Sequence, residues 1–344
     1  MSAAPTLTGQ IAVVAGATRG AGRGIARALG EAGATVYCTG RSRRGQPSPY
    51  NRPETIDETA EMVTAMGGRG IAVRVDHSIE AEVKALFARV AKECHRLDVL
   101  VNSIGGENPL FGGWASFWKT DLERASEALQ HSLVSHLITA KYAAPIMMKR
   151  RRGLIVEVTE NDMVFGGGGN ALTDVVKSAL KGFAARMAGE LYGHGVAAVS
   201  ITPGFLRSEA MLTHFGVTEA NWRDAGKKDK HFLLSESPLF VGRAVVALAG
   251  DPKILERSGD ILSSWEVARD YGLTDADGNR PDWGAHFGPV MAEVGFLEQF
   301  RRHGAFLDRM QRRMSQYLAA ADAAVAAREA EKADSAKKKR GAGK

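Results

Sequence analysis

The chain is poor in cysteine and has no long apolar run. Its 344 residues include two cysteines, Cys38 in a strand-like stretch and Cys94 in a helix-like one. Two such residues suit a reducing compartment, and we expect neither a disulfide framework nor a metal site. No apolar run reaches the ~18 residues that a membrane-spanning helix requires. We therefore expect no association with a membrane.

A secretion signal and a strongly charged body are also missing. The first ten residues have neither the basic start nor the apolar core of a signal peptide, which predicts a cytoplasmic location. The formal net charge is +6, but five basic residues near the end supply all but one of these charges. A nearly neutral body argues against nucleic-acid binding. The five residues are Lys337, Lys338, Lys339, Arg340 and Lys344.

A glycine-rich turn follows the first strand-like run. The β-branched stretch at residues 11–14 stops at Gly16, and Gly20 and Gly22 precede a helical pattern. Glycines allow a sharp turn, close contact of the backbone with a pyrophosphate and tight packing of helix on strand. The helix N-terminus would add unpaired N–H groups and the positive end of the helix dipole. These residues predict a dinucleotide-binding turn.

Strand and helix patterns alternate from residue 11 to about residue 263. The strand-like runs are short, apolar and bounded by Gly, Asp or Pro, as in a parallel sheet buried on both faces. Right-handed crossovers give a doubly wound α/β sheet, the Rossmann fold, with its ligand crevice at the carboxyl ends of the strands. The expected strands are 11–15, 35–39, 70–75, 98–101, 154–159, 197–202 and 260–263, and the expected helices are 22–32, 53–66, 79–94, 121–149, 173–192 and 238–249.

Other segments depart from this alternation. Residues 205–237 interrupt the core after the sixth strand and form the expected substrate lid. We divide the chain into a dinucleotide-binding and catalytic domain at 1–285, an amphipathic helical extension at 286–331 and a basic tail, expected to be disordered, at 332–344. The apolar stripe of the extension needs a partner surface, either on the domain or on another subunit.

The end of the second strand indicates which dinucleotide is bound. An NAD site usually has a carboxylate there, about 20 residues after the glycines, to bind the ribose hydroxyls. This strand ends without an acid and is followed by Arg41, while Arg19 lies in the glycine turn. Two guanidiniums would bind a 2′-phosphate, which predicts NADPH (NADP+); the alternative is two surface arginines. Asp76 would accept from the adenine amine or cap a helix.

The motifs together resemble the short-chain dehydrogenase/reductase (SDR) family over residues 8–263. They are the glycine turn of residues 16–22, Asp76, residues 101–105 (Val-Asn-Ser-Ile-Gly), Lys177 on a long helix and Pro203-Gly204. The resemblance implies a homodimer or homotetramer that acts on a small-molecule substrate. With the arginines, it predicts as cofactor-binding residues Gly16, Thr18, Arg19, Gly20, Gly22, Arg41, Ser42, Asp76, Asn102, Lys177, Pro203 and Gly204.

The resemblance also reveals an unusual catalytic set. Family members reduce carbonyls or oxidise alcohols with an Asn-Ser-Tyr-Lys set, in which the tyrosine transfers the proton and the lysine lowers its pKa. The lysine is retained as Lys177. The tyrosine position is Thr173, the serine position is Glu160, and the asparagine position, counted back from Pro145, is Ser132.

The missing tyrosine leaves the proton donor open. A threonine hydroxyl does not titrate in the accessible range and is too short to replace a phenol directly. Glu160 is a candidate acid, because a partly buried carboxyl group beside the crevice can have a raised pKa. The alternative is a carboxylate that pairs with Lys177 or is solvated at the mouth of the crevice. A carboxylate there would also suit a cationic substrate such as an iminium.

Two functions follow from these residues. The first is an NADPH-dependent reductase that transfers a hydride to a C=O, C=N or activated C=C bond. The proton would come from Glu160, from a water bound to Thr173 or from the substrate itself. The second is a non-catalytic NADP(H)-binding sensor or inactive partner subunit, which the changed catalytic positions favour. A nucleic-acid-binding role through the basic tail is the least favoured interpretation.

Overall fold

The computed structural model describes residues 6–46, 51–105, 116–160, 171–286, 290, 304–305, 308, 311–323 and 325–329. Its described strands form one parallel sheet of seven strands in the order β3-β2-β1-β4-β5-β6-β7. They are β1 (Ile11–Ala15), β2 (Thr35–Gly40), β3 (Arg69–Arg74), β4 (Val99–Asn102), β5 (Gly153–Val158), β6 (Val196–Thr202) and β7 (Ile261–Ser263). The predicted Rossmann fold is confirmed. The strand order reverses between β1 and β4, which places the ligand crevice at their carboxyl ends.

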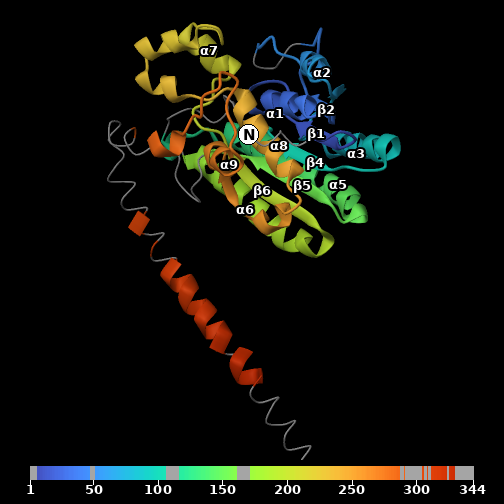
Figure 1. Ribbon diagram of the computed structural model, residues 1–344, viewed down its shortest axis with the longest axis vertical. Helices are drawn as coiled ribbons and strands as arrows, with labels where there is room; N and C mark the ends of the chain where they lie inside the picture. The colour runs from blue at the N-terminus through green and yellow to red at the C-terminus, as the bar shows by residue number, and fades with distance from the viewer. Residues whose placement is uncertain are drawn as a thin grey trace, which may run out of the picture. The chain divides into compact units, whose positions relative to one another are not determined.

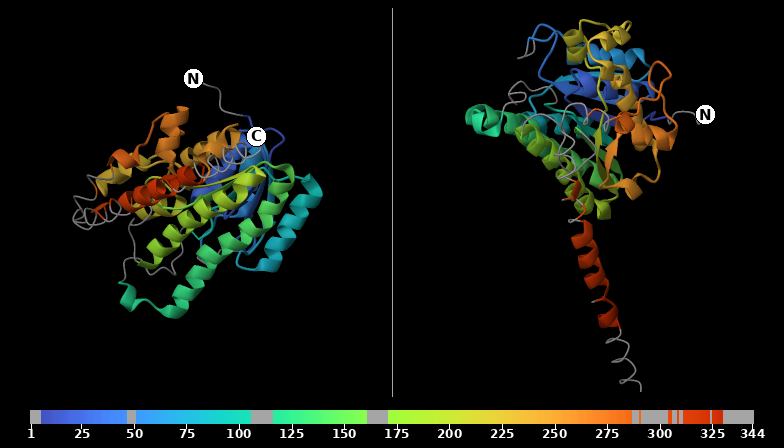
Figure 2. Two further views of the ribbon diagram at one scale, coloured as in Figure 1. Left: turned by 90° about the horizontal axis from the view of Figure 1, so that it is seen from below. Right: turned by 90° about the vertical axis from the view of Figure 1, so that its left-hand side faces the viewer.

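Helices cover both faces of the sheet (Figures 1 and 2). One face carries α1 (Gly20–Glu31), α2 (Ile56–Ala65) and α8 (Pro238–Gly250). The other face carries α3 (Glu80–Cys94), α5 (Ser135–Arg150) and α6 (Ala171–Leu191). The shorter helices are α4 (Leu122–Leu129), α7 (Glu209–Phe215) and α9 (Ser264–Tyr271).

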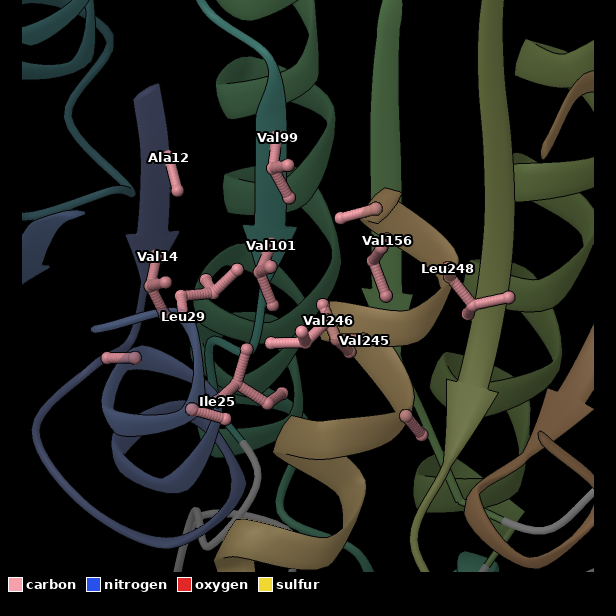
Figure 3. Packing of buried hydrophobic residues seen from close by; sticks show 14 of the residues in the cluster. Ala12, Val14, Ile25, Leu29, Val99, Val101, Val156, Val245, Val246 and Leu248 are labelled. Carbon is pink, nitrogen blue, oxygen red and sulfur yellow. The ribbon is translucent and has the colours of Figure 1, made fainter. Parts of the chain in front are cut away.

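The core around α1 and α8 determines how closely α1 approaches the sheet. In Figure 3, Ile25 and Leu29 of α1 meet the valines of β1 and β4, and Val245 of α8 packs beside them. Burial of each such side chain contributes about 1.5–3 kcal/mol. A β-carbon at Gly24 would lie 2.0 Å from the carbonyl oxygen of Pro238, so the two helix backbones are in contact. The N-terminus of α1 is therefore held rigidly at the crevice.

The helix expected over residues 121–149 is interrupted in the structure. Helix α4 is followed by a π-helical turn, η3 (Gln130–Val134), and then by α5. A π-turn inserts an extra residue and often marks a functional position. The π-turn contains Ser132, one of the predicted catalytic residues. It contains no glycine or proline that would indicate a break in the helix from the sequence.

The lid segment, residues 205–237, is folded. Helix α7 and the 3₁₀ helices η5 (Trp222–Lys227) and η6 (Lys230–Leu234) surround a small core with Phe215, Trp222 and Phe232. Among the described residues no helix has the length and apolar character needed to cross a bilayer.

The C-terminal part of the chain, Phe287–Lys344, forms a second compact unit after Met1–His286. Its residues 311–323 and 325–329 are helical. The tail at 332–344 lies outside the described residues. The disorder of the tail, the partner surface of the extension and the homo-oligomeric state all stay predictions. Light scattering on the full chain measures the oligomeric state.

Candidate functional site

The glycine turn forms a cradle that has no room for side chains. Gly16 has a φ of +83°, and a β-carbon there would lie 2.3 Å from the carbonyl oxygen of Ser103. A β-carbon at Gly22 would lie 2.2 Å from the Gly16 oxygen. The N–H groups of Gly16 and Ala17 both donate to the carbonyl of Thr39, at 3.0 and 2.9 Å. The turn is thus fastened between the ends of β2 and β4, and the start of α1 faces the crevice.

Each of the two predicted guanidiniums has an internal carboxylate partner. Arg19 Nε lies 3.3 Å from Glu54 Oε2, and an Arg41 nitrogen lies 4.0 Å from Asp76 Oδ2. Burial raises the pKa of Glu54, but hydrogen bonds from Arg52 and the charge of Arg19 outweigh it and hold that pKa below its usual value. Both arginine side chains are partly exposed, so an anion can reach them.

The other predicted residues on the adenosine side are buried or capped. Thr18 and Ser42 are buried, and Thr18 lies against the end of β2 at Gly40. Asp76 accepts from the N–H and hydroxyl of Ser78, at 3.0 and 2.6 Å. Burial opposes ionisation of Asp76, but these hydrogen bonds outweigh it and lower its pKa. The carboxylate therefore caps a turn ahead of α3 and not the helix itself, whose N-cap residue is Ile79, and it still faces Arg41.

The predicted catalytic residues form two small groups. Lys177 is 7% exposed and its Nζ lies 3.6 Å from Glu160 Oε1, while the Glu160 side chain is half exposed. Thr173 is one helical turn before Lys177 on α6, on the same face. Ser132 Oγ is buried and has no hydrogen-bond partner among the described residues. A β-carbon at Gly105 would lie 2.4 Å from that oxygen, so Ser132 lies directly under the loop after β4.

Comparisons with known proteins agree with this architecture. A family model described as "Enoyl-(Acyl carrier protein) reductase" matches residues 16–253. The chain is 40% identical over 307 residues to Dehydrogenase/reductase SDR family member 1 of Mus musculus, which covers 86% of this chain and 93% of that relative. The chain belongs to the short-chain dehydrogenase/reductase family. It is therefore a reductase or dehydrogenase of the SDR type.

Two further comparisons extend the likeness. The 3-oxoacyl-[acyl-carrier-protein] reductase FabG of Vibrio cholerae is 30% identical over 207 residues, 59% of this chain and 76% of that relative. The crystal structure of a short chain dehydrogenase from Mycobacterium thermoresistibile superposes with a TM-score of 0.67 at 21% identity, covering 81% of this chain and 93% of that one. The latter shows that the fold is shared. Within the described residues of this SDR, no cluster of His, Cys, Asp or Glu is arranged to hold a metal ion.

A buried histidine–glutamate pair under the crevice is not apparent from the sequence pattern. His136 of α5 and Glu157 of β5 are both fully buried, and Nδ1 lies 2.5 Å from Oε2. His136 Nε2 lies 3.1 Å from the carbonyl oxygen of Ile104, so Nε2 carries a proton and donates it. Asn102 donates to the other oxygen of Glu157 at 2.8 Å. The signal that points to the pair is a glutamate inside an apolar strand.

Asn102 is the last residue of β4, and Ile104 belongs to the loop that follows it. This loop borders the crevice, and the His136–Glu157 pair holds it from below. Asn102 Oδ1 is buried and has no partner within the described ranges. The predicted cofactor residue Asn102 thus supports the loop through its nitrogen.

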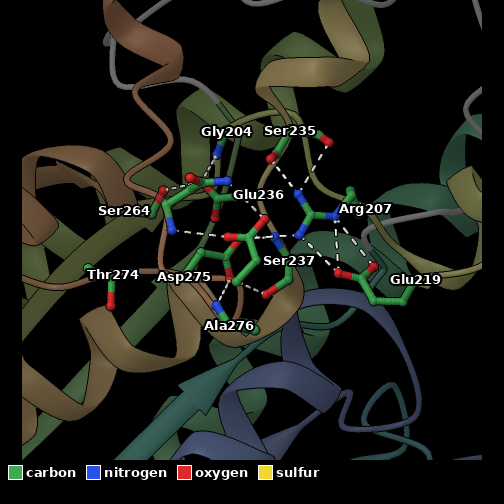
Figure 4. A network of polar contacts seen from close by, with 12 residues as sticks. Gly204, Arg207, Glu219, Ser235, Glu236, Ser237, Ser264, Thr274, Asp275 and Ala276 are labelled. Carbon is green, nitrogen blue, oxygen red and sulfur yellow. Dashed lines mark hydrogen bonds and ion pairs between the residues drawn. The ribbon is translucent and has the colours of Figure 1, made fainter. Parts of the chain in front are cut away.

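A second acid supports the loop after β6, where the predicted residues Pro203 and Gly204 lie. Figure 4 shows the Glu236 carboxyl group pointing at this loop. Glu236 Oε2 accepts from the N–H of Gly204 at 2.9 Å and from the hydroxyl of Ser264 at 2.6 Å. Oε1 is buried and has no partner in the described part of the chain. Burial raises the pKa of Glu236 to about 8, and hydrogen bonds from Ser264 and Gly204 offset part of this effect.

Two neighbouring charges face Glu236. Asp275 raises its pKa further and Arg207 lowers it. Arg207 is 2% exposed and binds Glu219, Asp275 and the carbonyl of Ser235. The base of the segment 205–237 is therefore a buried polar network, and its acid Glu236 holds a proton at neutral pH.

We expect this acid to make stability depend on pH. The pKa of Glu236 is about 4.5 in the unfolded chain and about 8 in the folded one, so its contribution is complete below pH 4.5 and is lost as the pH rises through 8. Between pH 6.5 and 8 the free energy of unfolding should fall by about 1 kcal/mol per pH unit from this group. Glu236→Gln should remove that part of the slope in urea denaturation.

Comparing the wild type with Glu236→Gln separates the pH dependence that comes from Glu236 from the one that comes from the buried His77. Burial lowers the pKa of His77 to about 3, which gives a stability that rises with pH, mainly below pH 6.5. Equal slopes for the two proteins between pH 6.5 and 8 would show that Glu236 does not titrate there.

Proposed function

We propose that this SDR is an NADPH-dependent reductase that transfers a hydride to a C=O, C=N or activated C=C bond of a small organic substrate. The observation that carries the proposal is the cradle at the ends of β1 and β2. Its turn admits only glycine at Gly16 and Gly22, and Arg19 and Arg41 border it. The strand β2 ends without a carboxylate that would bind ribose hydroxyls. Carbonyl reduction is also the reaction named for the FabG relative.

The residues of the cradle suit a phosphorylated dinucleotide. The N-terminal N–H groups of α1 and the helix dipole would hold the pyrophosphate. Arg19 and Arg41 would hold the 2′-phosphate, and Lys177 would bind the nicotinamide ribose. Pro203 and Gly204 would border the nicotinamide. The bound cofactor would supply the hydride, and the chain supplies binding, orientation and charge.

The proton needed at the reduced bond has three possible sources. A hydride brings two electrons to carbon, and a carbonyl oxygen or enolate then takes one proton. Glu160 is half exposed and can exchange protons with solvent beside Lys177. A water bound to Thr173, or the substrate itself, could serve instead. The Lys177 ammonium would stabilise the developing anion. An iminium substrate takes the hydride without a proton, which suits a site that lacks the family tyrosine.

A second candidate function is a non-catalytic NADP(H)-binding sensor or inactive partner subunit. Three of the four family catalytic positions are changed, to Thr173, Glu160 and Ser132, which favours this candidate. Titration with NADPH, followed by oxidation assays over carbonyls, imines and enones, separates the two. Turnover that falls in Glu160→Gln supports the reductase. Tight binding without turnover, unchanged by that substitution, supports the sensor.

Restoring the family tyrosine should raise ketone reduction. Thr173→Tyr places a phenol one turn before Lys177, where the ammonium favours its ionised form. A general acid contributes about 10²–10⁴-fold, and without the family serine we expect about tenfold over the wild type. Initial rates with NADPH and a panel of ketones measure this gain.

Val175→Tyr is the matched control, because residue 175 is exposed on the same helix. It should leave the rate unchanged. A folded Thr173→Tyr variant with no gain would mean that residue 173 does not correspond to the family tyrosine.

A further inference from the structure

A carboxylate from the lid occupies the N-terminus of α1. Gly20 is the first residue of α1, and its N–H donates a 2.7 Å hydrogen bond to Glu209 Oε2. The other oxygen of Glu209 lies 3.5 Å from the guanidinium of Arg23. Glu209 is the first residue of α7, after the N-cap residue Ser208. The contact joins residues 189 positions apart in the sequence.

These partners are the ones that bind a phosphate oxygen. An N–H at a helix N-terminus, the positive end of the helix dipole and a nearby arginine all favour an anion. The N-cap residue of α1 is Arg19, whose side chain makes no capping hydrogen bond within the described residues. The negative charge that caps α1 therefore comes from Glu209.

The start of α7 is packed against this position. A β-carbon at Gly20 would lie 3.8 Å from Ser208 Cβ and 3.9 Å from a methyl group of Leu206. The N–H of Gly20 cannot donate a full hydrogen bond to two anions, and two anionic oxygens in contact repel each other. A pyrophosphate placed at this N-terminus has to displace the Glu209 carboxylate.

We propose that Glu209 determines the affinity for the dinucleotide by competing with its pyrophosphate for the N-terminus of α1, so that cofactor binding releases α7. The inference rests on the proposed NADPH function. Helix α7 is the first helix of the lid, so the release couples cofactor loading to the position of the lid. The far end of α7 stays anchored, because Phe215 is buried against Phe232.

The substitution Glu209→Gln tests the competition. Glutamine keeps the length of the side chain and an oxygen that can accept from Gly20, but it removes the charge. In titrations followed by nicotinamide fluorescence, the variant should bind NADPH about tenfold more tightly than the wild type, or about 1.4 kcal/mol.

The matched control is Glu58→Gln. Glu58 is the other carboxylate on Arg23, at 2.7 Å, and does not contact Gly20. Glutamine can also complete the capping box that Glu58 forms with Thr55. This control should leave the Kd for NADPH within about twofold of the wild type.

Amide hydrogen exchange over residues 209–215 is a second measurement, which reports the release of α7 directly and does not depend on a change in the Kd for NADPH. NADPH should accelerate exchange there in the wild type, and in Glu209→Gln the exchange should already be fast without NADPH. If the wild type binds NADPH and the variant binds no more tightly, or α7 is protected equally in both, the competition is overturned. If neither protein binds NADPH, the proposed function itself fails.

Discussion

Replacing Glu157 by glutamine is expected to lower the free energy of unfolding by about 1–3 kcal/mol. Glu157 and His136 are fully buried, with 2.5 Å between the carboxylate and the imidazole. The substitution leaves a buried imidazole, which carries a proton on Nε2, facing a neutral amide. Removing one partner of a buried hydrogen-bonded pair is costly because the polar groups left behind stay desolvated without their full set of partners. Urea denaturation at neutral pH measures the change.

The loss extends to the crevice, because the pair supports the loop after β4. Asn102 donates to Glu157, and His136 donates to the carbonyl of Ile104. Freeing either contact loosens the loop that lies over Ser132. We therefore expect the Glu157→Gln variant to bind NADPH more weakly at temperatures where it is still folded.

The control for this prediction is Glu256→Gln. Glu256 is an exposed glutamate 3.8 Å from Lys253, so the same substitution is made in a solvated pair. Its urea midpoint should not change measurably. Combining Glu157→Gln with His136→Leu should recover part of the loss, because the imidazole then no longer stays buried without its carboxyl partner. Equal, small shifts for Glu157→Gln and Glu256→Gln would show that the buried pair contributes little.

The sheet was predictable because its signals are local. A parallel strand buried on both faces is a short apolar run between turn residues, and β1 has the same bounds, residues 11–15, in the prediction and in the structure. The glycine turn was equally recognisable, since Gly16 has a positive φ and a β-carbon at Gly22 would collide with the Gly16 oxygen in the same turn. The other strand ends agree to within one residue, because fraying makes such bounds imprecise.

The partners of the site residues were not predictable, because they come from distant parts of the chain. The pattern indicated Arg19 but not its partner Glu54, 35 residues away. It also gave no indication that Glu209 would cap α1. The π-turn at Ser132 has no residue type in its sequence that would indicate it. Tertiary contacts therefore decide which charges are available to a ligand.

The double substitution of Arg19 and Arg41 by alanine is expected to weaken NADPH binding about a hundredfold and to leave NADH binding nearly unchanged. Each guanidinium can make charge-assisted hydrogen bonds of about 1.5–3 kcal/mol to a 2′-phosphate. Part of this energy is offset, because each arginine already pairs with a carboxylate, Arg19 with Glu54 and Arg41 with Asp76. A net gain of about 3 kcal/mol corresponds to the hundredfold preference. Calorimetric titration of each variant with both coenzymes measures it.

Arg44→Ala is the control, because Arg44 lies three residues after Arg41 and pairs with the exposed Glu61 at 2.9 Å. It removes one positive charge near the site without removing a proposed phosphate ligand, so both affinities should stay as in the wild type. The single variants should each lose part of the preference, since the two guanidiniums bind one phosphate. Equal weakening of NADPH and NADH in the double variant would show that these arginines hold the pyrophosphate or the turn itself, and the preference would then have to come from residues elsewhere in the crevice.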